Sequence, residues 1–94
     1  MTHQPTAQNM RAFFEAWMAQ NDGGPMTSTQ LVPLAVEHGA LYTKGLAPTG
    51  AAMSLGRVMR AALTAHAAVL PYELVERRGR KAGRLLTLYR RGVA

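Results

Sequence analysis

Cysteine is absent from this chain of 94 residues. Its absence excludes disulfide bonds, thiolate-bound zinc, iron–sulfur clusters and cysteine nucleophiles. No apolar run reaches the roughly 18–20 residues that a membrane-spanning helix needs, and residues 1–5 lack the positive charge and apolar stretch of a signal peptide. We therefore expect a cytoplasmic protein without membrane contact, stabilised by the packing of its core alone.

Sequence motifs for catalysis are missing as well. Residues 50–57 come nearest to a phosphate-binding loop, but their spacing is wrong and no hydroxyl residue follows the basic one. The three histidines lie far apart in the sequence, without the spacing of a metal site. Ser54 has no Gly-x-Ser-x-Gly context. The sequence predicts no enzyme, no catalytic residue, no bound metal and no cofactor.

Acidic residues are few, five against eleven lysines and arginines, and the basic residues are concentrated late in the chain. Residues 57–94 contain nine basic and two acidic residues, a net charge of +7, whereas residues 1–56 carry a net charge of −1. This asymmetry favours a surface that binds a polyanion, although a basic surface that serves only solubility would have the same composition.

Two amphipathic helices are expected in the first half. Apolar residues recur at helical spacing on one face of residues 6–20, and residues 21–25 then favour a turn. Thr27 and Gln30 have the spacing of a capping box, which predicts a second helix from there to about His38, with Gly39 as its stop. Pro33 lies within that helix, so we expect a kink there or a later start.

A third helix and a hairpin are expected in the second half. Residues 39–50 are expected to form a connection, and the sequence does not decide whether it contains a short strand. Ser54 is expected to cap the third helix, and Pro71 to end it. The sequence period then changes from about 3.6 to 2 over residues 72–77, which predicts a strand with residues 72, 74 and 76 on one face and residues 73, 75 and 77 on the other. Residues 85–89 are a second β-prone run, and a basic, glycine-containing loop lies between the two. The predicted fold is α+β, a winged helix-turn-helix with three helices and a C-terminal β-hairpin wing. It forms one domain over residues 1–94, with residues 1–5 and 91–94 flexible.

Two groups of residues are candidates for DNA contact. The third helix would place polar and basic side chains on its outward face, where an arginine could grip a guanine edge or a phosphate. The hairpin tip gathers five cations that could contact the DNA backbone or minor groove. For each group a solvated surface remains the alternative. The helix residues are Ser54, Arg57, Arg60 and Thr64, and the hairpin residues are Arg77, Arg78, Arg80, Lys81 and Arg84.

Residues 14–89, about four-fifths of the chain, resemble the winged-helix domain at the C-terminus of phage and plasmid primase–helicase proteins, which also occurs in small phage DNA-binding proteins. The resemblance implies DNA handling by the third helix and the wing, although this chain has no primase or helicase domain. The similar segments are Trp17, residues 27–35 (TSTQLVPLA), residues 54–60 (SLGRVMR) and the closing Leu88 and Tyr89.

Several functions agree with this pattern. The first is binding of double-stranded DNA by a small transcription regulator or a phage or plasmid replication accessory, with a homodimer expected because one recognition helix gives limited specificity. The second is a phage-encoded inhibitor or interaction module whose basic face binds an acidic host protein. Binding of structured RNA is a third, but the sequence offers no surface aromatic platform for unpaired bases.

Overall fold

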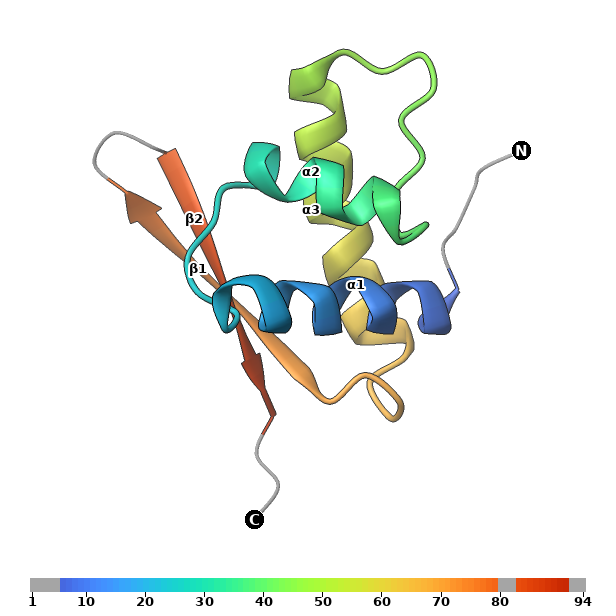
Figure 1. Ribbon diagram of the computed structural model, residues 1–94, viewed down its shortest axis with the longest axis vertical. Helices are drawn as coiled ribbons and strands as arrows, with labels where there is room; N and C mark the ends of the chain where they lie inside the picture. The colour runs from blue at the N-terminus through green and yellow to red at the C-terminus, as the bar shows by residue number, and fades with distance from the viewer. Residues whose placement is uncertain (1–5, 80–82, 92–94) are drawn as a thin grey trace.

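Residues 6–79 and 83–91 are described by a computed structural model, which folds into three helices followed by a two-stranded antiparallel hairpin (Figure 1). The α+β class is therefore confirmed, and the arrangement is compatible with a winged helix. Within these two ranges no helix is both long and apolar enough to cross a membrane. The elements are α1 (Ala7–Asn21), α2 (Ser28–Glu37), α3 (Pro48–Ala65), β1 (Tyr72–Gly79) and β2 (Gly83–Arg90).

Helices α1 and α2 begin at side-chain caps, and a residue with positive φ closes α1 and follows the C-cap of α2, where Gly39 has φ 73°. The Thr6 hydroxyl accepts the Asn9 amide at 3.1 Å at the start of α1, and Asp22, at φ 52°, closes that helix. The predicted capping box is confirmed, since Thr27 and Gln30 each accept the other's backbone amide. Residues 7–21 and 28–37 are helical, within a residue or two of the bounds that their spacing predicts.

Two expectations for α3 are wrong, and one of the two alternatives for α2 is excluded. Helix α2 begins at Ser28 and runs through Pro33, so it has no later start. Helix α3 begins at Pro48, six residues before Ser54, with Ala47 as its N-cap, so Ser54 is an interior residue and not a cap. Proline is favourable in the first helical turn because its missing N–H has no helical partner there. Residues 39–47 contain no strand, and α3 ends at Ala65, well before Pro71.

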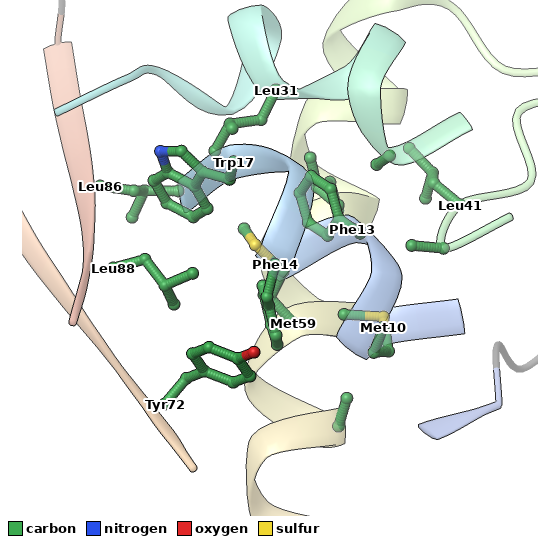
Figure 2. Close-up of a cluster of buried hydrophobic side chains, with 14 of the residues drawn as sticks. Met10, Phe13, Phe14, Trp17, Leu31, Leu41, Met59, Tyr72, Leu86 and Leu88 are labelled. Atoms are coloured by element: carbon green, nitrogen blue, oxygen red, sulfur yellow. The ribbon is translucent and has the colours of Figure 1, made fainter. Parts of the chain in front are cut away.

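The core joins the helices to the inner face of the hairpin (Figure 2). Trp17 of α1 is fully buried in the same cluster as Leu86 and Leu88 of β2. The rings of Phe14 and Tyr72 lie 5.1 Å apart between centroids. Each large apolar side chain removed from water contributes about 1.5–3 kcal/mol, so the core holds the hairpin firmly against α1.

The segment between α1 and α2 fastens the outer edge of β2. Met26 and Leu86 exchange both backbone hydrogen bonds, at 3.0 and 2.8 Å, as an isolated antiparallel bridge. The Leu88 amide donates to the Gly23 carbonyl at 2.8 Å. Gly23 is buried and has φ +70°. The hairpin is thereby held beside the helices by its backbone as well as by its side chains.

Candidate functional site

The outward face of α3 carries the residues expected there. The opposite face buries Ala51, Leu55, Met59 and Ala62, which leaves Arg57, Arg60 and Thr64 exposed and Ser54 half-buried. The Thr64 hydroxyl donates to the Arg60 carbonyl at 3.0 Å, so its proton is used within the helix. The two arginines are the side chains of this face that remain best suited to an anionic ligand.

The hairpin divides its arginines between two faces. Cross-strand partners share a face, and Glu76 lies opposite the buried Leu86, so Glu76, Arg78 and Arg84 are on the face turned toward the helices. Arg77, opposite Leu85, is on the other face. Two further candidates, Arg80 and Lys81, lie outside the described residues.

A groove of about 270 Å³ lies between α3 and the hairpin and brings three of the candidate arginines together. Arg57 and Arg60 reach it from α3, and Arg84 reaches it from β2. Ser28, the first residue of α2, also lines the groove. The positive end of a helix lies at its N-terminus, so α2 adds to the positive potential of the arginines.

One acidic side chain also lines this groove. Glu76 forms an ion pair with Arg60 at 2.9 Å and a longer one with Arg84 at 3.5 Å. Sequence reasoning missed Glu76 as a site residue, although its strand parity, shared with Tyr72 and Leu74, already places it on the inner face. Glu73 has the opposite parity and does not line the arginine groove.

Not every candidate residue belongs to the groove. Thr64 lines a separate depression between α3 and β1, which it shares with Arg60. Met53, which was not singled out from the sequence, stands 59% exposed at the rim of the arginine groove. Its position follows from helical spacing, since it precedes Arg57 by four residues. The groove therefore combines cationic, acidic and apolar groups.

The base of the hairpin, away from the groove, is tied to α1. Arg90 forms a bidentate pair with Glu15 at 3.0 and 3.2 Å, and the Tyr72 hydroxyl donates to the same carboxylate. The tyrosine hydrogen bond, followed by that from Arg90, holds the pKa of Glu15 below its usual value. Burial, then the hydrogen bond to Glu15, raises the pKa of Tyr72. Arg91 donates to the Ala67 carbonyl at 2.7 Å, so both terminal arginines are engaged within the protein.

Across residues 6–79 and 83–91, no group of three or more His, Asp and Glu side chains is placed to hold a metal ion. The groove between α3 and the hairpin is lined by three arginines and one glutamate. No family model, curated protein or solved structure matches the chain.

Proposed function

We propose that the protein is a winged helix-turn-helix module that binds double-stranded DNA through α3 and the hairpin wing. It would act as a small transcription regulator or as a phage or plasmid replication accessory. The observation that carries the proposal is the groove in which Arg57 and Arg60 of α3 meet Arg84 of β2. Arginines from two elements on one surface can contact a base edge and the neighbouring phosphates together.

The size of α3 and its position beside the hairpin support a role in DNA binding. A helix fits the major groove of B-DNA, which is about 12 Å wide. Arg57 and Arg60 lie on the exposed face of α3, next to a hairpin whose inner face carries Arg78 and Arg84 toward the tip. When α3 enters the groove, the hairpin would follow the adjacent backbone. The replication role is proposed only from the sequence resemblance of residues 54–60 described above.

Selection from a random duplex pool at about 50 and 200 mM salt tests the proposal. If five to seven phosphates are neutralised, log K should fall with log salt with a slope of about −4 to −6. An enriched motif would identify a sequence-specific regulator, and a palindromic motif would indicate that a homodimer binds two half-sites. Absence of duplex binding at the lower salt would refute the proposal.

Variants then separate the roles of the arginines. Arg57→Ala should lower affinity about tenfold and relax preference at one base position, whereas Arg84→Ala should weaken all sequences alike. Lys44→Ala is the matched control, because it removes the same charge from the loop between α2 and α3, outside the groove lining. Equal losses for all three variants would mean that only net charge matters.

A second function is favoured by Met53. Methionine is enriched in the cores of protein–protein interfaces, and Met53 is exposed at the rim of the groove, beside its arginines. An acidic protein surface with an apolar centre would complement this combination. For that function, duplex binding should be weak, without a motif, and lost by about 200 mM salt. Met53→Gln should then weaken the protein complex and leave duplex binding unchanged.

A further inference from the structure

Glu76 forms ion pairs with an arginine on each side of the groove, Arg60 of α3 and Arg84 of β2. Its carboxylate lies 2.9 Å from the Arg60 guanidinium and 3.5 Å from that of Arg84. All three side chains are partly exposed, at 35% for Glu76, 51% for Arg60 and 72% for Arg84. Ion pairs this exposed add little to folding stability. We therefore expect the Glu76 carboxylate to affect ligand binding more than stability.

We infer that Glu76 determines specificity, because it holds Arg60 and Arg84 away from phosphates and thereby weakens sequence-independent binding to DNA. The inference rests on the proposed function. A phosphate that approaches either guanidinium must displace the carboxylate or accept its repulsion. A base edge is treated differently, since a carboxylate accepts a hydrogen bond from the amino group of cytosine.

The difference between these two approaches gives Glu76 its effect. Sequence-independent affinity comes almost entirely from phosphate contacts and the counterions that they release. A single acidic residue between two arginines lowers that contribution for every sequence. Contacts to base edges lose less, because the carboxylate can take part in them. The ratio of specific to non-specific affinity therefore rises, although both affinities fall.

Glu73→Gln provides a matched control for Glu76→Gln. Both glutamates lie on β1 and both substitutions remove one negative charge, but Glu73 has the opposite strand parity and does not line the arginine groove. It lines the neighbouring depression between α3 and β1, which Arg60 and Glu76 also reach. Among residues 6–79 and 83–91, Glu73 forms no ion pair. Because both variants have the same net charge, a difference between their DNA affinities would be due to the position of the removed charge.

The experiment measures binding of both variants and the wild type to a random-sequence duplex, and to the motif recovered by selection, between about 50 and 200 mM salt. Glu76→Gln should raise affinity for the random duplex about tenfold at the lower salt. It should also steepen the slope of log K against log salt by about one to two, as one or two more phosphates are bound. Glu73→Gln should change affinity less than about threefold, with its slope unaltered. The ratio of motif to random affinity should fall only for Glu76→Gln.

The route of the effect is tested by adding Glu76→Gln to a protein that already carries Arg60→Ala and Arg84→Ala. The gain in random-duplex affinity should then disappear, because the arginines that the substitution would release are absent. Circular dichroism of each variant checks that the fold is retained. Equal gains for Glu76→Gln and Glu73→Gln, or a loss for Glu76→Gln, would overturn the inference alone. A wild-type protein that binds no duplex at about 50 mM salt would refute the proposed function and the inference with it.

Discussion

Gly23→Ala should destabilise the protein strongly, and more than Gly45→Ala or Gly56→Ala. Gly23 has φ +70°, and a Cβ built there lies 2.2 Å from the Leu88 carbonyl oxygen and 2.9 Å from the Met18 sulfur. The Met18 side chain can rotate away. The Leu88 carbonyl belongs to β2, and Leu88 itself is buried in the core, so the strand must move.

The magnitude follows from two contributions. A left-handed conformation costs a non-glycine residue about 1–2 kcal/mol. Displacement of β2 would also break the hydrogen bond from the Leu88 amide to the Gly23 carbonyl, and leaving such buried groups without partners costs about 1–3 kcal/mol more. The expected loss is therefore about 2–5 kcal/mol, a large part of the 5–15 kcal/mol that is usual for a domain.

Urea denaturation measures this loss, with fluorescence of Trp17, the single tryptophan of the chain, as the readout. Gly45→Ala is the matched control, because Gly45 has φ +80° but nothing lies within 4 Å of its Cβ position. That variant should lose only the conformational contribution, about 1–2 kcal/mol. If Gly23→Ala costs no more than Gly45→Ala, the close approach of the segment between α1 and α2 to β2 is not a stabilising contact.

Three further predictions concern the helices and the base of the hairpin. Thr27→Ala removes the capping box and should lower the free energy of unfolding by about 1 kcal/mol, whereas Thr29→Ala, on the exposed face of the same helix, should change it by less than about 0.5 kcal/mol in urea denaturation. Gly56→Ala should stabilise α3 by about 0.5–1 kcal/mol, since the nearest atom to its Cβ position is 3.5 Å away; a lower midpoint in urea would contradict this. The pKa of Glu15 is lowered in the folded protein by Tyr72 and Arg90, so its contribution to stability is present above its usual pKa of 4.5 and is lost as the pH falls through the lowered value. Glu15→Gln should therefore reduce stability at neutral pH and flatten its fall in acid, and an unchanged pH profile of the urea midpoint would be the contrary result.

Local periodicity predicted most of the fold. Helix α1 and the two strands were located to within a few residues because the apolar spacing that defines them is a property of neighbouring residues. The start of α3 could not be placed in this way. Ser54 is a strong capping residue in isolation, but Pro48 in the first turn and the burial of Ala51 extend the helix toward the N-terminus. Tertiary packing thus outweighed the local preference.

The candidate site was predicted only in part for a related reason. Sequence spacing placed Arg57 and Arg60 on one face of a helix, and it placed Arg84 in a hairpin. It could not show that these three side chains share a groove, or that Glu76 lies among them. That arrangement depends on the separation of α3 from the hairpin, which is set by long-range contacts such as the bridge between Met26 and Leu86.

That same bridge makes the two edges of the hairpin unequal. The edge of β2 is covered by the segment before α2, whereas β1, within the described part of the chain, pairs only with β2. An uncovered strand edge is a template on which another chain can assemble into a continuous sheet. Half of the eight residues of β1 are charged, namely Glu73, Glu76, Arg77 and Arg78. Glutamates and arginines along that strand discourage such assembly, so Glu76, which lines the arginine groove, also helps to protect the protein from aggregation.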